Sequence, residues 1–399
     1  MINITDLKKE EQLLPLLRLG FRPFFLFGSI FAFFAIAVWT LTLAGVISPT
    51  PLNGTFWWHS HEMLFGFVPA IIAGFLLTAV QTWTGIPSVK GNKLLFLVIV
   101  WAAARFLILA NIDISIYVVM LIDLSFLPLT GLFLGLPLFK IKQYRNMVFL
   151  PVLALMAFAN LLSYLPHFGY NSELSTRGFH AMVILTTVMV ALLGGRVIPM
   201  FTANGTVTQK VLPIKWLELS SMTSLFVILG FFMAGQTQFT LTLSIVCFIS
   251  GCLHLYRILR WRVWLTFAVP LVWVLHLTII FIPIGLFMMA AHFAFGTIML
   301  STALHALTVG VIGGMIIAMM SRVSLGHTGR MLKASPVIVF GFVSILLAAF
   351  VRSILTVLIP EYITQIWLVS GALWCVTFAC FIWMYLPILS APRVDGRPG

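Results

Sequence analysis

Long stretches of apolar residues, separated by short polar segments, follow one another along almost the whole chain. A helix needs about 20 residues to cross the roughly 30 Å of hydrocarbon in a bilayer, and twelve stretches reach that length. Each is apolar throughout instead of alternating between apolar and polar positions, so the pattern predicts helices and excludes barrel strands. The predicted spans cover residues 22–45, 57–83, 94–110, 114–139, 147–166, 178–203, 214–234, 238–256, 264–288, 295–321, 336–358 and 362–387.

Composition strengthens the prediction of an all-α, polytopic membrane protein. Apolar residues make up 61% of the 399 positions and charged residues only 8%, whereas a soluble domain has roughly 25% charged residues. The connecting segments are too short to form a soluble domain. We therefore expect an amphipathic N-terminus at 1–20, one membrane domain at 21–388, and a cytoplasmic tail at 389–399. The first twenty residues lack the apolar core of a signal peptide.

The net charge of +13 is distributed as a membrane topology requires and does not predict nucleic-acid binding. If the N-terminus is cytoplasmic, all but four of the 23 Lys and Arg residues fall in segments on the cytoplasmic side. Arg177 lies outside, and Arg105, Arg196 and Arg352 lie within spans. This bias follows the positive-inside rule. It predicts that both termini are cytoplasmic and that the lipid bilayer is the main partner.

The spans also suggest an internal repeat. The second, sixth and tenth begin near residues 57, 178 and 295, a spacing of about 120 residues that corresponds to four helices. His61 and His180 lie 119 residues apart, at equivalent places in two blocks. The pattern predicts three pseudo-repeats of four helices, which resemble the arrangement of haem–copper oxidases.

Histidines within the spans are the main candidates for function, because an ionisable group is costly inside a bilayer. His59, His61 and His180 fall at the outer ends of their spans, whereas His276 and His305 fall about ten residues from the nearest end. At 1.5 Å per residue, the last two are expected about 15 Å deep. Imidazole is a common ligand of haem iron and copper. We predict all five as metal ligands, with all but His59 binding a cofactor, although a hydrogen-bonded structural role remains the alternative for each.

Other polar residues within the spans are candidates to support these histidines. Glu62 can accept the second imidazole N–H of a neighbouring histidine and fix its tautomer. Arg105 and Asp123 lie in the outer halves of adjacent antiparallel spans, which predicts an internal ion pair. Alternatively, either residue, or Arg196 or Arg352, could face a haem propionate. The sequence assigns no catalytic residue.

Several motifs resemble the NnrS family, bacterial twelve-helix inner-membrane proteins that are described as containing haem and copper. The first two motifs are RLGFRPFFL at 18–26 and WWHSHEMLFG at 57–66. The others, HALTVG at 305–310 and RVSLGHTGR at 322–330, belong to the tenth span and its end. The resemblance covers essentially the whole chain. One departure is Gln81-Thr82, where the family more often has Pro-Asn, and it lies far from the proposed ligands.

This resemblance implies a role in the response to nitric oxide and nitrosative stress during denitrification, with nitric oxide as a ligand and an electron donor still to be identified. It also implies haem and copper as cofactors, and the five histidines match the family's recurring ones without being assigned to either metal. Two alternatives remain open: a respiratory-type oxidoreductase that reduces nitric oxide or oxygen, and a transporter without metal. The seventh span lacks a His-His pair, and the inner half holds few acids besides Glu218, which disfavours the oxidoreductase. Whether the protein is an enzyme is left open.

Overall fold

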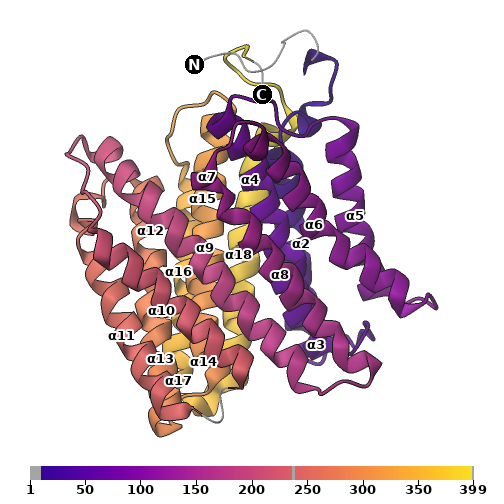
Figure 1. Ribbon diagram of the computed structural model, residues 1–399, viewed down its shortest axis with the longest axis vertical. Helices are drawn as coiled ribbons and strands as arrows, with labels where there is room; N and C mark the ends of the chain where they lie inside the picture. The colour runs from indigo at the N-terminus through magenta and orange to yellow at the C-terminus, as the bar shows by residue number, and fades with distance from the viewer. Residues whose placement is uncertain (1–9, 236–238, 398–399) are drawn as a thin grey trace. The chain divides into compact units, whose positions relative to one another are not determined.

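The computed structural model describes residues 10–235 and 239–397, and all of the regular secondary structure in these ranges is helical. Helix accounts for 81% of the chain, and the described residues contain no strand. Twelve helical runs are long and apolar enough to cross a membrane, which confirms the predicted fold class (Figure 1). They are Phe21–Leu43, Thr55–Thr84, Asn92–Ala110, Ile116–Lys140, Tyr144–Phe168, Glu173–Thr206, Lys215–Ala234, Thr240–Leu265, Pro270–Phe295, Leu300–His327, Pro336–Leu358 and Pro360–Ser390.

Seven of these runs are formed wholly or mainly by one long α-helix. These helices are α2 (Phe21–Leu43), α5 (Asn92–Ala110), α6 (Ile116–Lys140), α9 (Glu173–Thr206), α10 (Lys215–Ala234), α11 (Thr240–Leu259) and α18 (Ile363–Ser390). The fifth run joins α7 (Tyr144–Met147) to α8 (Phe149–Tyr164) and ends in a 3₁₀ turn at Leu165–Phe168. The ninth consists of α12 (Pro270–Ile279) and α13 (Phe281–Phe295).

The three remaining runs each contain a π-helical segment, in which the helix is wider by about one residue per turn. The segments are η2 (Glu62–Phe67), between α3 (Thr55–His61) and α4 (Val68–Thr84); η6 (Ala306–Gly313), between α14 (Leu300–His305) and α15 (Gly314–His327); and η7 (Val351–Leu355), between α16 (Pro336–Phe350) and α17 (Thr356–Leu358). A π-helical turn disrupts regular side-chain spacing and is frequent at functional sites. All three contain or directly follow an ionisable residue.

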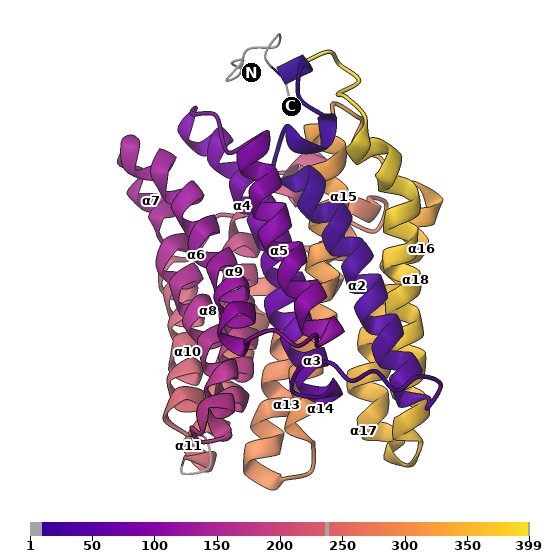
Figure 2. The same ribbon diagram turned by 90° about the vertical axis from the view of Figure 1, so that its right-hand side faces the viewer.

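The chain divides into two compact units. Unit 1 contains Met1–Phe179, Met320–Leu332 and Phe378–Gly399, and unit 2 contains His180–Met319 and Lys333–Thr377. In unit 1, α4 packs against α2 and α6, and α6 also packs against α5 and α8 (Figure 2). In unit 2, α11 packs against α10 and α13, and η6 lies against α13 and α16. The single membrane domain and the three pseudo-repeats stay predictions.

The start of α2 and the end of α18 meet within unit 1. Arg22 on α2 donates hydrogen bonds from Nη1 to the carbonyl oxygens of Leu389 and Ala391, at 2.8 and 2.7 Å. Beyond them, hydrogen bonds from the Arg393 guanidinium lower the pKa of the exposed Asp395 carboxyl below its ordinary value. Of the predicted amphipathic N-terminus, residues 1–9 lie outside the described residues, and the rest contains the 3₁₀ turn η1 (Pro15–Leu17).

The structure corrects the bounds of the ninth and tenth spans, which were predicted at 264–288 and 295–321. The helices begin five or six residues later, at Pro270 and Leu300, and end six or seven residues later. Proline is favoured in the first turn of a helix, where its missing N–H is not needed. Gly296, with φ of +66°, ends α13 in a left-handed conformation that suits glycine. Pro270 and Gly296 are both visible in the sequence, and they mark these helix ends where the apolar pattern does not.

Ser335 caps the start of α16 and offers a test of local stability. Its hydroxyl oxygen accepts a hydrogen bond from the backbone N–H of Ile338, at 3.3 Å. Replacing an N-cap serine by alanine costs about 1 kcal/mol, so Ser335→Ala should lower the free energy of unfolding by that amount. Reversible unfolding in detergent would measure the change. Ser390→Ala is the control, because the Ser390 hydroxyl bonds only within its own helix, to the carbonyl oxygen of Leu386, and should change stability less.

Candidate functional site

Four ionisable side chains form a cluster inside the membrane spans of unit 1. His61, Glu62, Arg105 and Asp123 come from α3, η2, α5 and α6, and none is more than 6% exposed. The Arg105 guanidinium forms an ion pair with Asp123, and its Nε lies 3.3 Å from Glu62 Oε2. The ion pair predicted between Arg105 and Asp123 is therefore confirmed. We call these four residues the unit 1 charge cluster.

Both ring nitrogens of His61 are engaged by acceptors. Nδ1 lies 3.0 Å from Glu62 Oε1, and Nε2 lies 3.0 Å from Asn160 Oδ1 and 3.2 Å from Asp123 Oδ2. The Asn160 amide nitrogen donates to Asp123 Oδ2 at 2.8 Å, which leaves its oxygen to face the imidazole. Metal ligation by His61 would therefore require the side chains around it to move.

The contacts of His61 also define the charge of the cluster. An imidazole that donates from both nitrogens is an imidazolium. Two carboxylates are then balanced by one guanidinium and one imidazolium, so the formal charges sum to zero. Buried charges are tolerated when they are paired and hydrogen-bonded. This neutrality explains how four ionisable groups can share one buried site.

Aromatic side chains enclose the unit 1 charge cluster. Trp57 stacks on the His61 ring with centroids 4.3 Å apart, and the Tyr164 hydroxyl donates to Asp123 Oδ2 at 3.1 Å. Trp101 Nε1 donates to the carbonyl oxygen of Gly66, at 2.8 Å, within the π-helical turn η2. Asn160 and Tyr164 were not predicted as site residues, although polar side chains in the apolar span 147–166 were a signal.

Gly66 lets the Arg105 side chain approach the helix backbone. A Cβ atom added at Gly66 would collide with Arg105 Nη1 and would lie 3.0 Å from its Cδ. It would also lie 3.1 Å from Glu62 Oε2. The π-helical turn η2 and its glycine thus place the guanidinium directly beside its carboxylate partners.

Unit 2 contains a second ion pair that the sequence did not predict. The Arg257 guanidinium binds both oxygens of Glu218, with contacts of 2.9 Å from Nε and 2.6 Å from Nη2. Nη2 also donates to the carbonyl oxygen of Ala191, at 3.0 Å, and the guanidinium lies 5.1 Å from the Trp261 ring centroid. Arg257 was assigned to a cytoplasmic segment, but it belongs to α11 and is only 1% exposed.

The helix bounds place His276 and His305 nearer to the ends of their spans than the sequence predicted. His276 lies six residues after the start of its span at Pro270, and His305 lies five residues after the start of the next span at Leu300. Both are therefore within about 9 Å of a span end. Because consecutive spans run in opposite directions, these two histidines lie toward opposite ends of this pair of spans. Both spans begin five or six residues later than predicted, which explains the difference in position along the helices.

The histidines of unit 2 have separate environments. His180, on α9, packs its ring against Phe232 at 5.0 Å, and no hydrogen bond to its ring is found within the described ranges. His276 Nε2 lies 2.8 Å from the Thr202 hydroxyl. His254 is fully buried, with Nε2 3.1 Å from the Ser221 carbonyl oxygen. Only His180 has both ring nitrogens available without displacing a hydrogen-bonding neighbour.

His305 faces an arginine at the start of another π-helical segment. Its Nδ1 lies 2.6 Å from the Ser301 carbonyl oxygen and therefore donates to it, so Nε2 carries the lone pair. Arg352 Nη2 lies 3.5 Å from this Nε2, and the guanidinium lies 4.7 Å from the centroid of the Trp367 ring. In Figure 1, α14 and α17 are close together at the lower end of the drawing.

The structure thus brings together some of the predicted site residues. His61, Glu62, Arg105 and Asp123 form one cluster, and His59 lies nearby on α3, stacked on Trp39 with centroids 4.3 Å apart. Those in unit 2 are His180, His276, His305 and the half-buried Arg196. Over residues 10–235 and 239–397, no three His, Cys, Asp or Glu side chains are grouped so that they could hold a metal ion.

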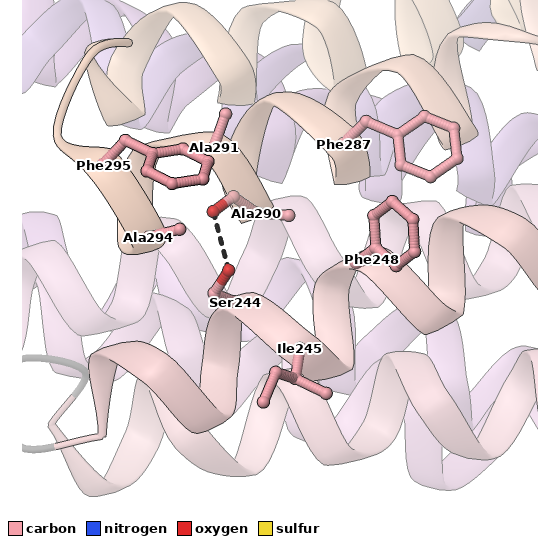
Figure 3. Close-up of a pocket in the computed structure, with 8 residues that line it drawn as sticks. All are labelled: Ser244, Ile245, Phe248, Phe287, Ala290, Ala291, Ala294 and Phe295. Carbon is pink, nitrogen blue, oxygen red and sulfur yellow. Dashed lines mark hydrogen bonds between the residues drawn. The ribbon is translucent and has the colours of Figure 1, made fainter.

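A groove of about 550 Å³ lies between α11 and α13 in unit 2 (Figure 3). Its lining is almost wholly apolar, with Phe248, Phe287 and Phe295 among the larger side chains. The Ser244 hydroxyl donates to the Ala290 carbonyl oxygen at 2.8 Å, so it is already satisfied. The groove lining therefore offers neither a metal ligand nor a charged group.

Fold and site together define a multi-pass membrane protein that holds ionisable and imidazole side chains inside its spans. A family model described as "NnrS protein" matches residues 15–393 of the 399. The chain therefore belongs to the NnrS family, as its motifs predicted, and this membership identifies it as a nitric oxide-related membrane protein. A comparison with curated proteins gave no match.

Proposed function

We propose that this protein acts in the response to nitric oxide and nitrosative stress, as a haem- and copper-binding protein of the bacterial inner membrane. The observation that carries the proposal is the family match over residues 15–393, combined with histidines inside the membrane spans. The excess of Lys and Arg on one side supports cytoplasmic termini. Haem supplies an iron atom that binds nitric oxide.

Among the histidines, His180 fits haem ligation best. A haem can be held by one proximal imidazole, and the His180 nitrogens have no hydrogen-bond partner to displace within the described ranges. His61 fits less well, because Glu62, Asn160 and Asp123 occupy both of its nitrogens. His305 is intermediate, since its Nε2 already faces Arg352.

Copper fits the described arrangement less well than haem does. A site with three protein ligands would need histidines, cysteines or carboxylates arranged around one position, and no group in the described part of the chain is arranged so that it could hold a metal ion. Copper binding therefore rests on the family resemblance. Metal analysis of the purified protein would test whether copper is bound.

A transporter without metal is the second candidate, and the unit 1 charge cluster favours it. Paired acids, an arginine and a histidine buried within spans are typical of substrate or proton pathways. The neutral, hydrogen-bonded arrangement around His61 needs no metal to account for it. A visible spectrum separates the candidates, because only the first predicts a haem Soret band.

We expect purified protein from haem-supplied cells to show a Soret band that His180→Ala largely removes, because the variant lacks the imidazole that would hold the haem iron. His167→Ala is the control, since His167 is exposed and bonds to Asn53 at 3.0 Å. Haem content per mole of protein is the measurement, with membrane insertion checked separately. A colourless wild type would refute haem binding. Equal haem in wild type and His180→Ala would instead refute only the role of His180.

A further inference from the structure

We propose that unit 2 binds a small oxyanion, or the carboxylate of a larger ligand, at Arg352. The site lies where the end of α14, the π-helical segment η7 and the start of α18 contribute His305, Arg352 and Trp367. Arg352 and its neighbours would form this site whether or not the protein binds haem.

Arg352 is a buried cation without a carboxylate partner. Its side chain is only 8% exposed, comparable with Arg105 at 6% and Arg257 at 1%. Arg105 pairs with two acids and Arg257 binds Glu218 through two nitrogens. Within the described ranges, the neighbours of Arg352 are the neutral His305 and the ring of Trp367. A buried charge left uncompensated is costly, so the site has a place for an anion.

A local pattern shared with unit 1 shows which charge is missing. In both units a histidine directly precedes a π-helical segment, with glycine five residues later at Gly66 or Gly310. The next residue is Glu62 after His61 but Ala306 after His305. The next span then supplies Arg105 in unit 1 and Arg352 in unit 2. Unit 2 therefore repeats the histidine and the arginine without the carboxylate that joins them in unit 1.

The second carboxylate of unit 1 is missing as well. Asp123 follows Arg105 by 18 residues, and the residue that follows Arg352 by 18 is Ser370. The Ser370 hydroxyl donates to the Ala348 carbonyl oxygen at 3.0 Å. It contributes no negative charge, so a ligand would have to supply what Glu62 and Asp123 supply in unit 1.

The elements that form the site carry buried hydrogen-bonding groups that have no partner of their own. Arg352 Nη1, Trp367 Nε1 and Thr302 Oγ1 are buried and have no hydrogen-bond partner in the part of the chain that the structure describes. Two of the three are donors only, and Thr302 can also donate. The planar guanidinium suits carboxylates and other planar oxyanions. Formate and nitrite have the corresponding size and charge.

The site lies near the ends of its spans, so an anion would have a short path to it from the aqueous phase. Thr302 and His305 lie two and five residues after the start of their span at Leu300, and Arg352 lies six residues before the end of its span at Leu358. Trp367 lies seven residues into the last span, which begins at Pro360. All of them are within about 11 Å of a span end, and these span ends lie on the side opposite the predicted cytoplasmic one.

The test is a titration of detergent-purified full-length protein with sodium formate or sodium nitrite, with ionic strength held constant by a bulky sulfonate salt. Protein is prepared from haem-supplied and from haem-deprived cells, and Tm and haem content are recorded. We expect a saturable rise in Tm in wild type, and a loss of affinity of about tenfold or more in Arg352→Gln, as for a charge-assisted hydrogen bond. Arg352→Lys should keep part of the response. Arg177→Gln, which removes an exposed ion pair with Glu173, should respond as wild type does.

The two sources of the anion give different outcomes. If free anions bind, both preparations respond and Arg352→Gln does not. If a haem carboxylate occupies the site, only haem-deprived protein responds, and Arg352→Gln lowers the haem content of the other preparation. A flat response in both preparations, with unchanged haem in Arg352→Gln, would overturn the proposal. A colourless but anion-responsive protein would refute haem binding and leave the anion site standing.

Discussion

Arg105→Gln should be among the most destabilising single substitutions in this protein, with a loss of about 3–5 kcal/mol in the free energy of unfolding. Glutamine keeps much of the size of arginine but removes the charge that Glu62 and Asp123 share. Two carboxylates would then remain buried beside one imidazolium. Reversible unfolding in detergent, followed by tryptophan fluorescence, would measure the loss.

Two further variants make this prediction specific to the unit 1 charge cluster. Arg177→Gln removes an arginine from an exposed pair with Glu173, at 2.9 Å, and should cost about 0–1 kcal/mol. Adding Asp123→Asn to Arg105→Gln should recover part of the stability, because it removes one of the unpaired charges. Similar losses for Arg105→Gln and Arg177→Gln would show that the buried pair adds nothing to stability.

Gly195→Ala should disrupt the second ion pair, at a cost of about 1–3 kcal/mol for the added methyl group. A Cβ atom at this position would collide with Arg257 Nη2 and would lie 2.9 Å from Cζ of the same guanidinium. It would also lie 3.1 Å from Glu218 Oε2, so it enters the contact between the two charged groups. Thermal unfolding of the variant in detergent would show the destabilisation.

Gly230→Ala is the matched control, since Gly230 is also a helical glycine of unit 2. No atom lies within 4 Å of a Cβ added there. Alanine in a helix interior is more stable than glycine by about 0.5–1 kcal/mol, so this variant should unfold at the same temperature as wild type or higher. Destabilisation of both variants to the same degree would argue against a specific contact at Gly195.

The fold was predictable because membrane spans are set by length and hydropathy, which can be read directly from the chain. The bounds at Pro336 and Leu358 agree with the predicted span, and most other ends differ by only a few residues. The largest errors lie at the end of the eighth span, predicted at 256 and found at Leu265, and around Pro270 and Gly296, where the apolar pattern continues through a turn. In such places proline and glycine mark helix ends better than hydropathy does.

The candidate site was predictable only where a buried charge required a partner of opposite charge. Arg105 and Asp123 were paired correctly because a buried guanidinium needs a carboxylate and adjacent antiparallel spans offered one. Glu218 and Arg257 were not paired, since an end error of a few residues placed Arg257 in a loop. The partners of His61 could not be predicted, because sequence does not give the rotation of one helix against another.

The structure does not test the predicted metal ligands. His59, His61, His180, His276 and His305 stay predictions, since a group of protein ligands can be recognised in sequence only by spacing or family resemblance. The structure adds what each imidazole nitrogen already contacts, and this makes His180 the most available ligand among them. Haem content in single variants will decide the assignment.

The π-helical segments change how faces should be assigned along three of the spans. An α-helix turns by about 100° per residue, and the wider turn in a π-helix holds one residue more. A helical wheel drawn at constant pitch therefore misplaces every residue beyond Phe67, Gly313 or Leu355 by about one position. Removing one residue within such a segment would return the rest of the span to regular pitch with its lipid-facing side preserved, whereas the same deletion elsewhere would rotate that side into the protein.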